Sequence, residues 1–147
     1  MSKSMTLRDY IQVEWVTNYG KVLNIVSPWT AAHLIVEAIE SLGYIISNSY
    51  DPKAKHRGCG KTFNDALKEC PSLNCYTTVD GMYGEFRSAF AHSGCSGITL
   101  NNTDTENLVT PNYTVSAKLL YKRFVDACDY VCTKYSERVD VPLLSIG

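Results

Sequence analysis

The sequence predicts an all-α fold, a bundle of four or five helices that run up and down, with one elaborated loop or small hairpin. Two observations predict it. Apolar residues recur at steps of three and four over most of the chain, and capping and helix-breaking residues divide that pattern into segments. With 147 residues and 45% hydrophobic content, the chain is expected to form one domain spanning residues 1–147.

The first helix is predicted to begin at Thr6. Thr6 is followed three residues later by Asp9, which is the spacing of a capping box, in which each side chain accepts a hydrogen bond from the other residue's backbone N–H. The positions that follow at steps of four and three are Ile11, Trp15, Asn18, Val22 and Ile25. This pattern indicates one long helix with a single inward face.

The second helix is predicted to begin at Ser27-Pro28, because serine caps helices well and proline is tolerated in the first turn. The same rhythm continues through Ala31, Ile35, Ala38, Leu42 and Ile45. Two helices joined by so short a break are expected to fold back as an antiparallel hairpin.

The middle of the chain is less regular. Glycine, proline and basic residues predict a loop over residues 49–60, followed by a short helix over residues 62–69 that ends before Pro71. Asp80 is expected to cap a further helix that stops at Gly94. The inward face of that helix is expected to carry Met82, Phe86, Ala89 and Phe90.

The C-terminal third is expected to begin with the small hairpin or irregular flap, built from residues 97–100 and 107–110. A last helix is predicted over residues 113–137, and the apolar residues 139–146 are expected to dock on the bundle. The inward residues of the last helix are Leu120, Phe124, Ala127, Val131 and Tyr135.

Charge and composition limit the function classes. A net charge of -1 and a pI near 6.3 argue against a protein that coats nucleic acid by bulk electrostatics, so any such contact must be local. The sequence shows no apolar stretch of signal-peptide or membrane-spanning length, so we expect a cytoplasmic protein that does not enter a membrane. Its six cysteines are then expected to be free thiols.

The most informative stretch is Arg87-Ser-Ala-Phe-Ala-His92, followed by Ser93-Gly94. It places a permanent cation near a titratable imidazole, a pair that can handle a phosphodiester. On a helix, Ser88 and His92 share a face, so the hydroxyl can orient the imidazole. The alternative is that Arg87 is a surface residue and that His92 favours the negative end of a helix.

This Arg-x4-His motif, late in a chain that begins with a helical hairpin, resembles the HEPN superfamily, whose signature is Arg, four to six residues, then His. The resemblance implies a metal-independent endoribonuclease or toxin, in which His92 transfers protons and Arg87 binds phosphate. It also implies a homodimer with two motifs in one cleft, and an antitoxin or a nucleotidyltransferase-like protein as a partner. Ser88 departs from the polar amide or carboxylate often found after the arginine, which favours a non-catalytic member.

A second candidate region is basic. Residues 53–61 hold four of the chain's fourteen lysines and arginines, namely Lys53, Lys55, Arg57 and Lys61. They are candidates for contacts with an RNA backbone, although such runs are more often solvated loops without a ligand. The end of this run imitates a phosphate-binding P-loop, but it lacks the first glycine and a preceding strand, so we do not expect nucleotide hydrolysis.

Metal and cofactor sites are not expected. Cys59, Cys70, Cys75 and Cys95, with His56, lack the tight Cys-x2-Cys spacing of a zinc knuckle. Cys128 and Cys132 stand four apart, as expected for packing on one helix face.

The leading hypothesis from the sequence is a HEPN-type metal-independent endoribonuclease, part of a defence or toxin–antitoxin system, whose catalytic residues are Arg87, Ser88 and His92. The competing hypothesis is a non-catalytic HEPN-like helical module that binds a partner protein or a small ligand through the same cleft. Both predict the same kind of bundle, so the fold alone does not separate them.

Overall fold

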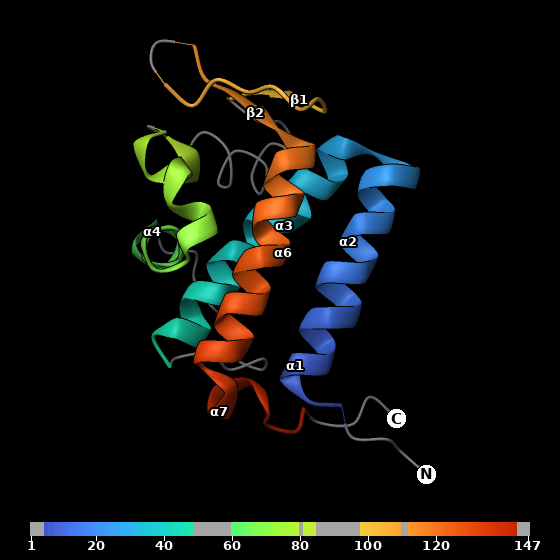
Figure 1. Ribbon diagram of the computed structural model, residues 1–147, viewed down its shortest axis with the longest axis vertical. Helices are drawn as coiled ribbons and strands as arrows, with labels where there is room; N and C mark the ends of the chain where they lie inside the picture. Colours follow the sequence, from blue (N-terminus) through green and yellow to red (C-terminus); the bar gives the residue numbers. More distant parts are fainter. Residues whose placement is uncertain (1–4, 49–59, 80, 85–97, 110–111, 144–147) are drawn as a thin grey trace.

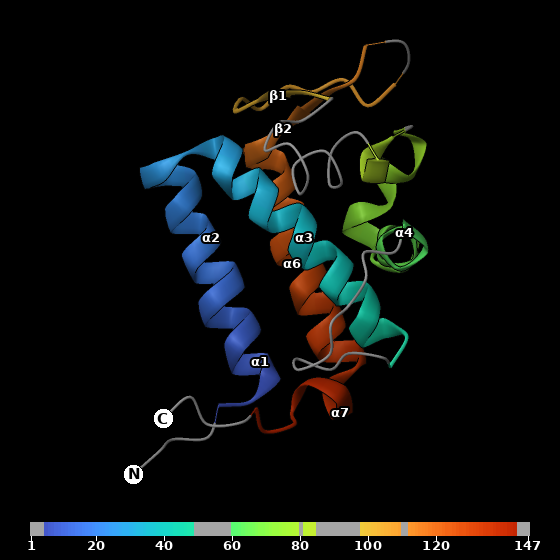
Figure 2. The same cartoon turned by 180° about the vertical axis from the view of Figure 1, so that it is seen from behind.

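The structure is a computed structural model, and it describes residues 5–48, 60–79, 81–84, 98–109 and 112–143. These residues are mostly helical, as the sequence predicts (Figure 1). Helices α3 and α6 lie side by side in the middle, with the N-terminal helix on one side and α4 on the other (Figures 1 and 2).

The N-terminal helix runs through four consecutive segments, in which α-helical and wider π-helical turns alternate. These are α1 (Leu7–Tyr10), η1 (Ile11–Thr17), α2 (Asn18–Lys21) and η2 (Val22–Val26). The capping box forms as expected, because Thr6 Oγ1 accepts from the Asp9 N–H at 3.1 Å and Asp9 Oδ2 accepts from the Thr6 N–H at 3.2 Å. The predicted first helix is therefore confirmed, with Ile11 and Trp15 buried. The expectation that Ile25 belongs to its inward face is wrong, because Ile25 lies at the last turn before α3 and is 79% exposed.

Helix α3 (Pro28–Ile46) turns back along the N-terminal helix and completes the predicted antiparallel hairpin. Ser27 caps it by accepting from the Thr30 N–H at 3.3 Å, with Pro28 in the first position. The helix lies at the centre of the molecule, and more than half of its residues are buried. They are Ala31, Ala32, Ile35, Val36, Ala38, Ile39, Glu40, Leu42, Gly43 and Ile45.

Helix α4 (Gly60–Glu69) corresponds to the predicted short helix, and a 3-10 helix follows it directly as η3 (Pro71–Thr78). Helix η3 was not predicted from the sequence. It forms because proline fits the first position of a helix and because Asn74 reaches back to the end of α4. The Asn74 amide donates to the carbonyl oxygens of Leu67 at 2.7 Å and Lys68 at 2.9 Å.

The C-terminal end of α4 is also tied to α6 (Ala117–Lys134). Glu69 Oε1 accepts from Lys134 Nζ at 2.5 Å and from the Tyr135 hydroxyl at 2.8 Å. The hydrogen bond from Lys134 lowers the pKa of the Glu69 carboxyl. Both bonds hold α4 in a fixed position relative to the middle of the bundle.

Of the two arrangements predicted for residues 97–100 and 107–110, a hairpin or an irregular flap, the hairpin does not form between the described residues 98–100 and 107–109. Strand β1 (Thr99–Asn101) pairs with β2 (Thr114–Ser116), and the two strands run parallel, with Leu100 opposite Val115. The last helix therefore starts at Ala117 rather than at 113. Ser116 caps that helix by accepting from the Leu119 N–H at 3.2 Å.

The chain's final described segment docks as predicted. After α6 a short helix α7 (Ser136–Val139) leads to residues 140–143, which lie against the start of the chain. The Leu7 N–H donates to the Val141 carbonyl at 3.1 Å, and the Leu143 N–H donates to the Met5 carbonyl at 2.7 Å. The rest of the predicted tail, residues 144–146, lies outside the described residues.

Helices α3 and α4 approach each other closely at Gly43. A Cβ atom added there would lie 2.1 Å from the Thr62 carbonyl oxygen and 2.7 Å from its methyl carbon. Only glycine permits this distance without moving the α4 backbone.

We predict that Gly43→Ala lowers the free energy of unfolding by about 1–3 kcal/mol, since overpacking outweighs the gain in helix propensity. Urea unfolding followed by circular dichroism measures this. Gly84→Ala is the control, because no described atom lies within 4 Å of a Cβ at that position. Equal stability of the two variants would contradict the close contact.

Candidate functional site

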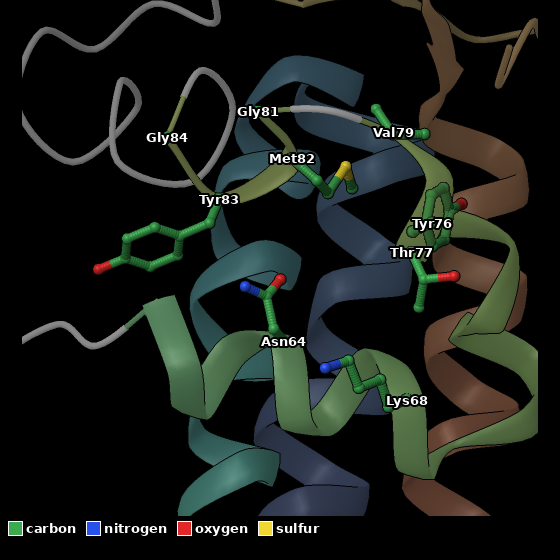
Figure 3. A pocket seen from close by; sticks show the side chains of 9 residues that line it. All are labelled: Asn64, Lys68, Tyr76, Thr77, Val79, Gly81, Met82, Tyr83 and Gly84. Atoms are coloured by element: carbon green, nitrogen blue, oxygen red, sulfur yellow. The ribbon is translucent and has the colours of Figure 1, made fainter.

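A pocket of about 360 Å³ lies between α4, η3 and residues 81–84 (Figure 3). Helix α4 and η3 form two of its sides, and the short segment of residues 81–84 closes a third. The residues that line it are Asn64, Lys68, Tyr76, Thr77, Val79, Gly81, Met82, Tyr83 and Gly84.

The buried part of the lining is mainly apolar. Tyr76, Val79 and Met82 are all buried, and two backbone bonds bring them together. The Val79 N–H donates to the Tyr76 carbonyl at 3.1 Å, and the Met82 N–H donates to the Val79 carbonyl at 3.2 Å. Gly81 has a φ of 78°, in the region that favours glycine, and so allows the chain to turn there.

The rim of the pocket is polar. Asn64 and Lys68 stand four residues apart on the exposed face of α4, so they share that face, and Figure 3 shows both on the side of α4 toward residues 81–84. Within the described parts of the chain, no hydrogen bond or ion pair involves either side chain. The Thr77 hydroxyl donates to the Asn74 carbonyl at 2.7 Å, which leaves its oxygen free to accept.

Of the site residues predicted from the sequence, only Lys61 is among those that the structure describes. It lies on α4 seven residues before Lys68, so the two lysines and Asn64 form one stripe on the helix. The Lys61 side chain is 85% exposed, and its Nζ is 3.8 Å from Asp65 Oδ2. The predicted site residues outside the described ranges are Arg87, Ser88, His92, Lys53, Lys55 and Arg57.

The described residues on both sides of the motif segment pack on the core. Of the helix predicted over residues 80–94, the structure describes only residues 81–84. Met82, before the motif, is 2% exposed, and Ile98, after it, is 5% exposed. The Tyr83 ring also packs on Phe63 of α4, with 5.6 Å between the ring centroids.

A charged network of Arg123 and Glu106 holds Tyr76 on the η3 side of the pocket. Arg123 of α6 donates to the Tyr76 hydroxyl at 3.0 Å and to Glu106 Oε1. Its guanidinium carbon also lies 5.3 Å from the centroid of the Tyr76 ring. The Glu106 side chain is 8% exposed, so this ion pair is largely withdrawn from solvent. Burial raises the pKa of the Tyr76 hydroxyl, which therefore stays protonated.

Further bonds join the strand region to η3. Glu106 Oε2 accepts from the Ser116 N–H at 3.3 Å, at the end of β2. The Tyr113 hydroxyl donates to the Thr78 carbonyl at 3.3 Å, and the Thr78 hydroxyl donates to the Leu108 carbonyl at 3.4 Å. The loop after the motif is thus fastened to the same 3-10 helix that lines the pocket.

The cysteines serve packing where the structure describes them. Cys70, Cys128 and Cys132 are buried free thiols, which confirms the packing role expected for the helical pair. Burial raises the pKa of the Cys70 thiol to about 12, so it is neutral and unreactive. The zinc candidates Cys59, Cys95 and His56 lie outside the described residues, and no metal-binding cluster occurs within them.

The described helices include none that is both long and apolar enough to cross a lipid bilayer. Comparison with known proteins found no matching family model, no matching curated protein and no matching solved structure. The HEPN resemblance therefore stays a prediction from the motif.

Sequence reasoning missed Asn64, Lys68 and Thr77. The spacing of Lys61, Asn64 and Lys68 in steps of three and four does place them on one helix face. Nothing in the sequence, however, indicates that residues 81–84 lie opposite that face.

We predict that Glu106→Gln lowers the free energy of unfolding by about 1–3 kcal/mol, because it leaves the partly buried Arg123 charge without its carboxylate. Chemical denaturation measures the change. Asp104→Asn is the matched control. Asp104 lies 3.0 Å from Lys118 of α6, but both side chains are mostly exposed, so its loss should stay within about 0.5 kcal/mol. A larger loss for Asp104→Asn than for Glu106→Gln would show that the buried network is not the stronger tie.

Proposed function

We propose that this chain is a HEPN-type, metal-independent endoribonuclease in which Arg87, Ser88 and His92 carry the chemistry. The observation that supports it most is the position of the pocket in the chain. Gly84, which lines the pocket, stands three residues before Arg87, and the rim offers a lysine, an amide and a hydroxyl. These are groups that bind the phosphate, sugar and base edges of RNA.

The proposed reaction is an internal transfer within the RNA chain. The 2′-oxygen attacks the neighbouring phosphorus and loses its proton to a base, while the bond from phosphorus to the 5′-oxygen breaks. An acid protonates that leaving oxygen, so the products are a 2′,3′-cyclic phosphate and a 5′-hydroxyl end. His92 takes one of the two proton-transfer roles, since an imidazole titrates near neutral pH.

Arg87 and Ser88 assist in this scheme. The guanidinium of Arg87 stabilises the charge that builds up on the phosphoryl oxygens, and the Ser88 hydroxyl orients the imidazole. One histidine in the motif leaves the second proton-transfer group to be supplied by another chain. We therefore propose a homodimer in which two motifs face one cleft, and light scattering on the purified protein measures its mass against the 16.4 kDa of one chain.

The exposed apolar residues of the N-terminal hairpin support self-association. Ile25 is 79% exposed, Val26 70% and Trp29 53%, and the three lie at the corner where η2 passes into α3. Clustered apolar side chains of this kind are typical of surfaces that a partner covers. An antitoxin or a nucleotidyltransferase-like protein is the heterologous partner that this proposal includes.

The second candidate function is a non-catalytic helical module that binds a small ligand. The pocket itself favours it, because 360 Å³ with an apolar floor and a polar rim suits a small molecule without any need for catalysis. The two candidates differ in one observable, which is the cleavage of RNA without added metal.

We predict that His92→Ala and Arg87→Ala each slow RNA cleavage at least about 100-fold, since each removes a group that acts in the transition state. The assay uses mixed RNA in a metal chelator, and circular dichroism checks that each variant folds. His33→Ala is the matched control, because His33 lies on α3 with its Nε2 3.2 Å from Glu37 Oε1, and it should cut at the wild-type rate. If the His92 and Arg87 variants cut as fast as the wild type, the catalytic assignment is wrong.

A further inference from the structure

We propose that the pocket beside α4 binds a phosphorylated nucleoside unit. The Lys68 ammonium contacts the phosphate, the Asn64 amide contacts the polar edge of the base or the sugar, and the apolar floor takes a face of the base. A free nucleotide and a nucleotide within single-stranded RNA share this chemistry. The RNA form of the ligand rests on the function proposed above, whereas the pocket itself does not.

The positive charge at the rim is available to a ligand. The acidic residues of α4 next to Lys68 are already paired with other cations, Asp65 with Lys61 and Glu69 with Lys134. In the described part of the molecule no carboxylate lies within ion-pair distance of Lys68. A lysine is a compact cation on a flexible stem, so it can follow a phosphate in a partly exposed site.

The neutral polar groups give the rim donors and acceptors of both kinds. The Asn64 amide presents two N–H donors and a carbonyl oxygen, and none of these is used by another described residue. The Thr77 hydroxyl uses its proton in the bond to the Asn74 carbonyl, so its oxygen can only accept from a ligand. An amide with both functions matches the edge of an unpaired base.

The size of the pocket distinguishes a nucleotide from a simple anion. Val79 and Met82 line its bottom but are only 4% and 2% exposed, so the apolar surface that they offer a base is small. The volume of about 360 Å³ lies at the small end of ligand pockets, which span roughly 300–1,000 Å³. A flat apolar ring with one attached anion uses both the floor and the rim.

The stripe on α4 extends the site in one direction. Lys61 lies seven residues before Lys68, which is roughly 10 Å along the helix axis, and Asn64 lies between them. Lys61 pairs with Asp65 at 3.8 Å, but its side chain is 85% exposed, so a second phosphate of the backbone can still reach it. In RNA, the unit next to the one in the pocket would therefore pass over Lys61.

Fluorescence anisotropy with a labelled single-stranded RNA of about 10 nucleotides tests this proposal. His92→Ala is the background in every sample, so that the RNA is not cut. Lys68→Gln should weaken binding about tenfold and reduce the slope of log affinity against log salt by about 0.7, the value for one lost phosphate contact. Asn64→Ala should weaken binding without changing the slope. Lys21→Gln is the control, because Lys21 is an exposed lysine on α2, on the other side of the bundle. The RNA affinity and the salt slope of this variant should be unchanged.

Competition separates the two sources of ligand. A nucleoside 5′-monophosphate should displace the RNA more effectively than inorganic phosphate, since only the nucleotide contacts the floor. The pocket assignment is overturned if inorganic phosphate competes as well as the nucleotide, or if Lys68→Gln binds RNA as tightly as the His92→Ala background. It is also overturned if no RNA binds. RNA binding that depends on Lys68 in a wild-type protein that never cuts RNA would leave the pocket standing and remove the nuclease proposal. Cleavage of RNA by a protein whose RNA binding does not depend on Lys68 would leave the nuclease proposal standing and remove the pocket assignment.

Discussion

The close contact between α3 and α4 at Gly43 is the constraint on which the arrangement of the site depends. More than half of the residues of helix α3 are buried, and α4 rests on it at a distance that leaves no space for a side chain at Gly43. At its other end α4 is fixed by the bonds from Lys134 and Tyr135 to Glu69. A helix held at both ends presents its remaining face in one orientation. That face carries Lys61, Asn64 and Lys68, and it forms one side of the pocket.

The opposite side of the pocket depends on a different kind of interaction. In η3, Leu73 and Tyr76 are both completely buried, and Tyr76 is in addition bonded to Arg123, which in turn pairs with Glu106. This network is costly to break, since removing either charge leaves the other partly buried. It also connects the two described regions that adjoin residues 85–97, because Glu106 belongs to the loop after the motif and Tyr76 precedes it. The polar network therefore adds to the apolar core, to which Tyr76, Val79 and Met82 belong, in supporting the site.

The elements that depend on local signals could be predicted from the sequence. The capping box at Thr6, the Ser27-Pro28 break and the apolar rhythm of α3 act within a few residues, and each element formed where expected. The errors come from long-range contacts. Residues 99–101 pair in parallel with 114–116 rather than in a hairpin, and η3 forms because Asn74 bonds back to α4. The motif residues Arg87, Ser88 and His92 lie outside the described residues, so their predicted roles rest on the sequence pattern.

The sequence did not indicate the pocket, because its sides come from three segments that only the fold brings together. Lys68 and Asn64 are ordinary residues of an exposed helix face until residues 81–84 are placed opposite them.

The central claim is that this pocket receives a nucleotide. The most direct measurement is a titration of the isotope-labelled His92→Ala variant with single-stranded RNA, followed by the chemical shifts of its backbone amides. We expect the largest shifts at Asn64, Lys68, Thr77, Gly81 and Gly84. Shifts centred on Ile25 and Trp29 instead, with the pocket amides unchanged, would contradict the account.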